Sequence, residues 1–184
     1  MRAFVAVELS QAVRDRLVAV QRELARHGAA VRWVRDDHLH LTLKFLGNLE
    51  AEALAALRAD LAATLGTTPP LTATIRGLGV FPDARRPRVV WAGVACGGLA
   101  AVAAAVDGAA ARVGVVPETR PFRPHVTLGR VTAAARWTPL GQALAARAAE
   151  ELGSCAIDAL VGVRSDLRAD GALYTKLWSI PFGG

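Results

Sequence analysis

Two short strings constrain the fold of this chain more than any other feature. They are HLTL at residues 40–43 and HVTL at residues 125–128. Each alternates polar and apolar residues, as a β-strand with one core-facing side does. Because residues i and i+2 of a strand share a face, each string presents one imidazole and one hydroxyl together. Two such strands predict a site built from two histidines and two threonines.

Composition is that of a globular protein without a membrane span. The chain has 184 residues, of which 53% are hydrophobic and only 5% aromatic, so we expect an aliphatic core and alanine-rich helices. No signal peptide is expected, because Met1 runs directly into a strand-like segment, and charged residues interrupt the most apolar stretch, 99–116. Cys96 and Cys155 stand alone and are expected to be reduced packing residues. We therefore expect a soluble, cytoplasmic protein.

The charge balance favours a polyanionic partner. The formal net charge is +6 and the isoelectric point is about 10.6, mainly through arginine. A basic excess attracts phosphates, as in RNA. One group of arginines lies in a single loop and consists of Arg85, Arg86 and Arg88. A second group flanks the second string and consists of Arg120, Arg123 and Arg130.

Helical and strand patterns alternate on both sides of the middle of the chain. The expected strands are 3–9, 31–34, 39–46, 71–81, 88–94, one that lies within 121–131, 155–167 and 172–178, the last two joined as a hairpin across 168–171. The expected helices are 10–27, 50–65, 99–113 and 139–152. Each half thus contains one string in a similar context. We predict one domain over residues 1–184, with two lobes related by a pseudo-twofold axis around a shared groove.

Two histidines are suited to phosphodiester hydrolysis. The ordinary pKa of histidine is about 6.5, so near neutral pH one ring can be protonated while another is neutral. One imidazole can take a proton from attacking water while the other protonates the leaving oxygen. Two threonine hydroxyls can donate hydrogen bonds to the non-bridging phosphate oxygens. This scheme requires no metal.

Two alternatives remain open. His38 shares strand parity with His40, so these two with His125 could form a metal site. Only Asp36 and Asp37 are acidic nearby, which argues against a metal centre. The other alternative is a groove that binds RNA or a nucleotide without turnover. The presence of both histidines and both threonines of the two strings argues against it.

The strings and their flanks resemble a known family. HLHLTLKFLG and RPHVTLGR are similar to the two signature strings of the 2H phosphoesterases. The opening RAFVAVELS and the ending VRSDLRADGALYTKLWSI resemble the RNA 2′,3′-cyclic phosphodiesterases, also called 2′-5′ RNA ligases. The resemblance implies an α+β, bilobal fold, with antiparallel sheets lining a central groove and helices outside. It also implies cofactor-free hydrolysis of RNA 2′,3′-cyclic phosphates to 2′-phosphomonoesters, with ATP-independent ligation as the reverse reaction.

The resemblance also assigns roles to the motif residues. His40 is expected to protonate the departing 3′ oxygen and His125 to activate water, while Thr42 and Thr127 hold the phosphate. This direction comes from the resemblance, because the spacing is symmetric between the two histidines. The substrate is expected to be an RNA end, such as that of a tRNA fragment, or a nucleotide with a cyclic phosphate. A monomer is the default expectation.

Three further residues are candidate substrate contacts. Arg123 shares parity with His125 and is favoured by geometry. Strict alternation turns Arg130 away from the groove, although Gly129 permits a β-bulge there. Tyr174 is expected to line the groove and to meet a base or ribose.

Overall fold

The computed structural model describes residues 1–133, 135–168 and 171–183. Its strands are β1 (Arg2–Glu8), β2 (Ala30–Trp33), β3 (His40–Asn48), β4 (Leu71–Phe81), β5 (Val89–Ala95), β6 (His125–Ala133), β7 (Glu151–Ile157), β8 (Ala159–Arg168) and β9 (Gly171–Pro181). Its helices are α1 (Gln11–Ala25), α2 (Ala51–Leu65), α3 (Leu99–Arg112) and α4 (Trp137–Ala146), with a short 3₁₀ helix, η1 (Asp36–His38). No helix of the described residues is both long enough and apolar enough to cross a membrane.

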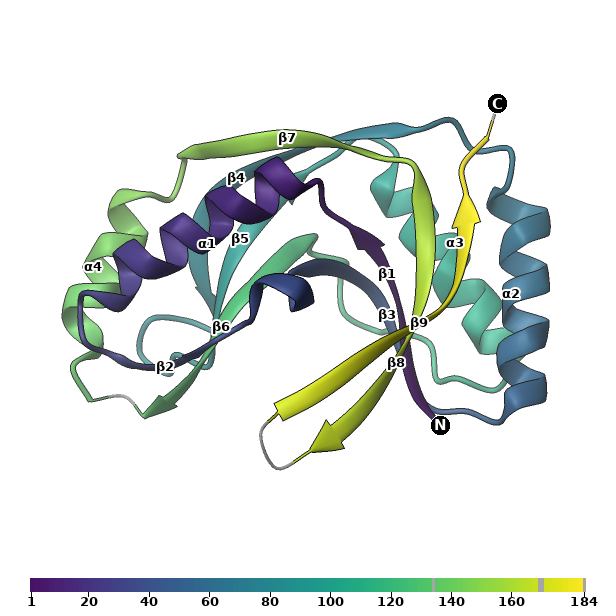
Figure 1. Cartoon of the computed structure of the whole chain (residues 1–184), viewed down its shortest axis with the longest axis horizontal. Helices are drawn as coiled ribbons and strands as arrows, with labels where there is room; N and C mark the ends of the chain where they lie inside the picture. Colours follow the sequence, from purple (N-terminus) through teal and green to yellow (C-terminus); the bar gives the residue numbers. More distant parts are fainter. Residues whose placement is uncertain (134, 169–170, 184) are drawn as a thin grey trace.

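One curved antiparallel sheet forms the centre of the molecule (Figure 1). The strand order is β7-β4-β5-β6-β3-β1-β8-β9, and β2 adds to β6. The two motif strands, β3 and β6, meet through a single residue pair, Leu41 with Val126. We call β3, β1, β8 and β9 with α2 and α3 the His40 lobe, and β6, β5, β4, β7 and β2 with α1 and α4 the His125 lobe. The expected sheets of the two lobes are therefore joined into one.

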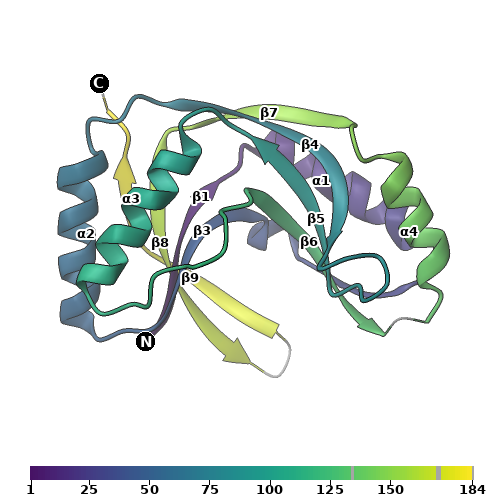
Figure 2. The same cartoon turned by 180° about the vertical axis from the view of Figure 1, so that it is seen from behind.

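The two lobes exchange helices. The order β1-α1-β3-α2 in the first half is repeated as β5-α3-β6-α4 in the second. However, α1 follows β1 of the His40 lobe in sequence but contacts β7 of the His125 lobe. In the same way, α3 follows β5 of the His125 lobe but packs against α2 of the His40 lobe (Figure 2). The two lobes therefore correspond to each other across the β3–β6 junction, both in the order of their strands and in the exchange of helices. This agrees with the predicted pseudo-twofold relation.

Helix α1 shows how local sequence builds these elements. The side chain of Ser10 caps it by accepting a hydrogen bond from the backbone N–H of Val13. The residues at helical spacing are buried against the sheet: Val13, Leu17, Val20 and Leu24. The predicted helix 10–27 is confirmed, although it ends at Ala25.

The predicted helix 139–152 is wrong at its end. Alanine-rich sequence favours a helix there, but α4 ends at Ala146 and β7 begins at Glu151. Buried Leu152, Cys155 and Ile157 pack into the core while β7 pairs with β4, so tertiary pairing overrides the local preference.

The predicted strand 155–167 is also wrong, because it divides at Asp158. The preceding segment, β7, pairs with β4 at the edge of the His125 lobe. The following segment, β8, pairs with β1 in the His40 lobe and forms the predicted hairpin with β9. Residues 169 and 170 of the predicted hairpin turn lie outside the described residues.

The hydrophobic core lies between the sheet and the helices, and its largest fully buried side chains are aliphatic, as composition predicts. A second, smaller cluster covers the opposite face of the His40 lobe and consists of Phe4, Ala6, Val161 and Val163, with Tyr174 packed against it. This opposite face, which also carries His40, is called the groove face below.

Candidate active site

The β3–β6 junction brings the two strings together. Leu41 and Val126 pair across the junction, and both are fully buried in the main core. Continuing this antiparallel register by one residue places His40 across from Thr127 and Thr42 across from His125. All four side chains alternate with buried residues and are half-buried on the groove face. The two strings thus form one site.

Both imidazoles are oriented in the same way. His40 Nδ1 lies 2.7 Å from the carbonyl oxygen of His38, and His125 Nδ1 lies 2.7 Å from that of Arg123. Because a carbonyl oxygen can only accept, each Nδ1–H donates. The Nε2 atom is therefore the nitrogen available for proton transfer in both rings. Thr42 Oγ1 lies 3.0 Å from His40 Nε2.

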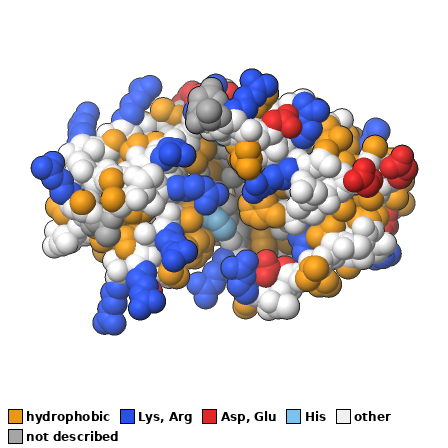
Figure 3. All heavy atoms as spheres, turned by 90° about the horizontal axis from the view of Figure 1, so that it is seen from below, with side chains coloured by type: hydrophobic (Ala, Val, Ile, Leu, Met, Phe, Trp, Pro, Cys, Tyr) orange, Lys and Arg blue, Asp and Glu red, His pale blue; other side chains and the backbone are white. Residues whose placement is uncertain are grey.

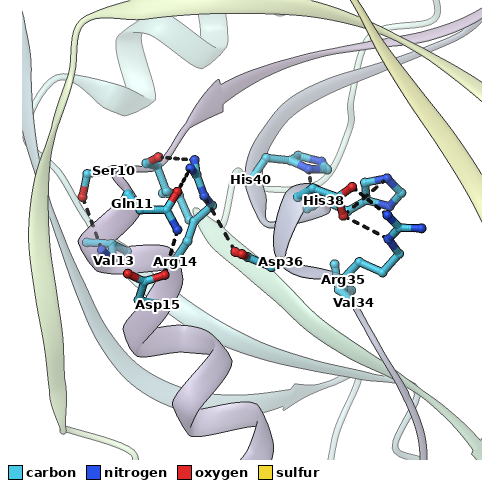
Figure 4. Close-up of polar contacts among 12 residues, drawn as sticks. Ser10, Gln11, Val13, Arg14, Asp15, Val34, Arg35, Asp36, His38 and His40 are labelled. Atoms are coloured by element: carbon cyan, nitrogen blue, oxygen red, sulfur yellow. Dashed lines mark hydrogen bonds and ion pairs between the residues drawn. The ribbon is translucent and has the colours of Figure 1, made fainter.

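The segment that supplies the carbonyl of His38 is held from α1. Arg14 Nη1 donates to the carbonyl oxygen of Leu9 at 2.8 Å, and Arg14 Nε lies 3.8 Å from a carboxylate oxygen of Asp36 in η1 (Figure 4). This bridge links α1 to η1, which contains His38, the residue whose carbonyl orients His40.

The surroundings of the two histidines differ. The ring of Phe4 stacks on His40, with 4.8 Å between centroids, and Tyr174 meets His40 edge-on at 5.6 Å. The ring centroid of Tyr174 also lies 4.3 Å from that of His38. On the other lobe, Phe81 contacts His125 edge-on at 5.0 Å. The His40 side is therefore an aromatic wall, to which Tyr174 contributes.

A cavity of about 180 Å³ lies against this wall. Its lining mixes apolar side chains with charged ones: Phe4, Glu8, Arg14, Asp37, Leu39, His40, Val161, Val163, Tyr174 and Lys176. A larger cavity, of about 240 Å³, lies between α1 and the β2–η1 segment and contains neither motif histidine. The smaller cavity borders the two-histidine site on the His40 side, since His40 lines it and Thr42, His125 and Thr127 do not.

Burial lowers the pKa of His40 below its ordinary value. The hydrogen bond to the carbonyl of His38 opposes this shift, and the charge of His38 adds to it. Without ligand, His40 is therefore neutral near pH 7, with Nδ1 protonated and Nε2 free to accept from Thr42.

This shift predicts a pH dependence of stability. The unfolded chain binds a proton at His40 more readily than the folded chain, so the stabilisation is present above about pH 6.5 and is lost as pH falls. We expect the free energy of unfolding to decrease more between pH 7.5 and 5 in the wild type than in the His40→Ala variant. Urea denaturation at several pH values measures this difference. Equal pH dependence in the two proteins would contradict it.

A β-bulge changes the face on which strict alternation would place Arg130. In the β5–β6 ladder Trp91 pairs with Thr127 and Val90 with Gly129, so Leu128 is the extra residue. Alternation is shifted by one, which returns Arg130 to the groove face beside Thr127. Gly129 is required there because a Cβ atom would lie 2.5 Å from Val31 Cγ1.

The same irregularity occurs in the first string and reveals a residue that sequence analysis missed. In the β1–β3 ladder Ala6 pairs with Thr42 and Val5 with Lys44, which turns Phe45 onto the groove face. Its side chain is 63% exposed, and its ring lies 6.0 Å from Phe4. Aligning HLTLKF with HVTLGR places Phe45 against Arg130, a signal that was available in the sequence.

Lys44 takes the core-facing position that the bulge creates. It is buried, forms an ion pair with Asp107 of α3, and donates to the carbonyl oxygen of Val116 at 2.8 Å. Asp107 also accepts from the backbone N–H of Glu118 at 3.1 Å. These contacts tie the segment that leads to His125 to the strand that carries His40.

The structure does not assemble the alternative metal site. Within the described ranges, no group of three or more His, Cys, Asp or Glu side chains is arranged to hold a metal ion. The ring of His38 packs against Tyr174 instead. Arg123 is exposed, and its contact with the site is the carbonyl that orients His125.

Comparison with known proteins agrees with this geometry. The sequence model of the family described as LigT like Phosphoesterase matches residues 7–91, which include the first string. An RNA 2′,3′-cyclic phosphodiesterase of Methanothermobacter thermautotrophicus is 33% identical over 96% of this chain and 96% of its own. The chain belongs to the LigT-like phosphoesterases.

Solved structures of LigT-like phosphoesterases and related proteins share the whole fold. A crystal structure from Thermus thermophilus superposes with a TM-score of 0.84 at 30% identity, covering 100% of this chain and 99% of the other. Escherichia coli LigT complexed with 3′-AMP gives a TM-score of 0.79 at 30% identity, with 98% and 97% covered. The predicted α+β bilobal fold is confirmed.

Proposed function

We propose that this protein opens 2′,3′-cyclic phosphates at RNA ends to 2′-phosphomonoesters, without a metal ion or other cofactor. The observation that carries this proposal is the pairing of the two strings at Leu41 and Val126, with both Nε2 atoms left available. The name shared by the relatives, RNA 2′,3′-cyclic phosphodiesterase, supports the same substrate class.

The proposed reaction is an in-line displacement at phosphorus. His125 Nε2 takes a proton from water as its oxygen attacks, and the bond from phosphorus to the 3′ oxygen breaks. His40 Nε2–H gives its proton to that oxygen. Neutral His40 acquires this proton when the negative phosphodiester binds beside it, because a nearby anion raises the pKa of a histidine.

The phosphate is held by groups on both lobes. Thr42 and Thr127 donate to the non-bridging oxygens, where charge develops. Arg130 contributes positive charge from the groove face, and Arg123 does so from the segment before β6. The bulge in β6, which brings Arg130 to the groove face, supports this role for a residue that sequence analysis had named.

The terminal nucleoside lies in the cavity of the His40 lobe. Since His40 protonates the 3′ oxygen, the ribose must lie on its side of phosphorus. The rings of Phe4 and Tyr174 there, with exposed Phe45, offer stacking surfaces for the base and packing for the ribose.

We further propose that the site functions in a cytoplasmic monomer. Both strings come from one chain, so a second subunit is not needed to complete the site.

The reverse reaction, in which an RNA 5′-hydroxyl replaces water, would give a 2′-5′ linkage without ATP. RNA ends, including those of tRNA fragments, are the proposed substrates.

The test is incubation with excess EDTA and a short RNA that ends in a 2′,3′-cyclic phosphate. We expect full turnover and a 2′-phosphate product, identified by nuclear magnetic resonance of phosphorus. Loss of activity in EDTA that is restored by a divalent metal would overturn the metal-free mechanism. Binding of the RNA end without turnover would instead indicate a binding module.

A further inference from the structure

Two polar side chains are buried among the residues that the structure describes, and each is associated with the β-bulge of one string. They are Lys44, which is 8% exposed, and Gln21, which is 6% exposed. Lys44 lies in the bulge of β3 itself, whereas Gln21 reaches the bulge of β6 from helix α1. Burial of an amide is costly unless its hydrogen bonds are made. The contacts of Gln21 therefore indicate what it does.

The side-chain amide of Gln21 joins two backbone carbonyl groups. Its Nε2 atom donates to the carbonyl oxygen of Leu128 at 2.8 Å and to that of Val34 at 2.8 Å. The backbone N–H of Val34 also donates to the carbonyl oxygen of Leu128, at 2.9 Å. One side chain thus completes a small network between α1, β6 and the segment that leads into η1.

Leu128 is the extra residue of the β6 bulge. In the described β5–β6 ladder the residues on both sides of it are paired, whereas Leu128 has no partner of its own. A bulged residue interrupts the regular hydrogen bonds of its strand. Gln21 and Val34 supply donors to its carbonyl oxygen instead. The bulge is therefore braced from outside the β5–β6 ladder.

This bulge decides which groups of β6 face the reacting phosphate. It lies between Thr127 and Arg130 and turns Arg130 to the groove face. Lys and Arg side chains gather around the hollow in which a histidine is visible (Figure 3). A cation there stabilises the phosphate only if its strand holds it in the productive geometry, and a displacement of about 1 Å can cost about 10²-fold in rate.

We propose that Gln21 is a positioning residue that holds the bulge of β6, so that Thr127 and Arg130 meet the phosphate together. This inference rests on the proposed function and deepens it, since it makes a residue outside the groove responsible for the geometry of phosphate binding. Helix α1 contributes to the main core, on the opposite side of the sheet from the groove face. Gln21 therefore acts through the carbonyl group of Leu128 and not on the substrate.

The test is a double-mutant cycle between Gln21→Met and Arg130→Met, with a nucleoside 2′,3′-cyclic monophosphate as substrate. Methionine keeps the length of glutamine and has no donor. Arg130→Met is expected to lower kcat/KM about tenfold or more in the wild type, as loss of a hydrogen bond to a charged group does. In the Gln21→Met background, where Arg130 is already misplaced, the same substitution should cost less than about threefold.

Two controls separate positioning from a merely structural role. Val20→Ala removes the neighbouring buried side chain of α1, and the full effect of Arg130→Met is expected in its background. Thr42→Val removes the hydroxyl of the other string, and its effect should add to that of Gln21→Met. Additivity of Gln21→Met with Arg130→Met, or equal coupling with Thr42→Val, would overturn the proposal. If Gln21→Met does not fold, Gln21→Leu replaces it with the same expectations.

Failure of the proposed function is distinguishable from failure of this inference. If the wild type does not turn over the cyclic phosphate, the proposed function fails, but amide hydrogen exchange still measures the brace. We expect the backbone N–H of Val34 to exchange at least about tenfold faster in Gln21→Met than in Val20→Ala, after correction for global stability. In the wild type, the side-chain amide protons of Gln21 should exchange slowly. Equal exchange in the two variants, or fast exchange of these amide protons, would refute the brace.

Discussion

His40→Ala and His125→Ala are each expected to lower the rate of cyclic phosphate opening by about 10²- to 10⁴-fold. Each imidazole is assigned one proton transfer, and a positioned acid or base typically contributes that much. Rates are measured with the cyclic mononucleotide under single-turnover conditions. The control is His27→Ala, because His27 is exposed just after α1 and is not part of the site.

A modified substrate separates the two roles. When sulfur replaces the 3′ oxygen, the leaving group departs without protonation. We expect His40→Ala to recover most of its activity on this substrate and His125→Ala to remain inactive. Recovery by His125→Ala instead would reverse the assignment of donor and acceptor. Recovery by neither variant would contradict the division of roles.

Leu41→Ala is expected to decrease the free energy of unfolding by about 2 to 5 kcal/mol, the usual cost of a leucine-sized cavity in a core. Leu41 is fully buried and forms the single β3–β6 pair with Val126. Its removal also loosens the strand between His40 and Thr42, and a small displacement of catalytic groups can cost about 10²-fold in rate. Urea denaturation and kcat of the folded protein measure the two effects.

Leu57→Ala is the matched control for this substitution. Leu57 is also fully buried, but it lies on α2, away from the junction. We expect a similar loss of stability with kcat retained at temperatures where both variants are folded. If Leu41→Ala retained kcat as well, the junction would have no special role in aligning the site.

Much of the site could be predicted from local sequence. Alternation around His40 and His125 was sufficient to place an imidazole and a hydroxyl on one face of each strand, because side-chain period is a property of the strand itself. Helices such as α1 were also predictable, since Ser10 and the spacing of buried leucines and valines act within one segment.

Other features depend on partners far away in the sequence. The end of α4 and the division of 155–167 at Asp158 follow from pairing with β4 and β1. Local composition contains no information on which strand a segment will meet.

The sequence by itself determined the chemical groups of this site and the face of the strand on which each lies. The tertiary structure decided that the two strings pair at Leu41 and Val126, and that bulges turn Phe45 and Arg130 into the groove. A bulge is a mismatch between two strands, so it exists only once both are in register. Alternation predicts the direction of each side chain within a strand, whereas pairing decides where that alternation is interrupted.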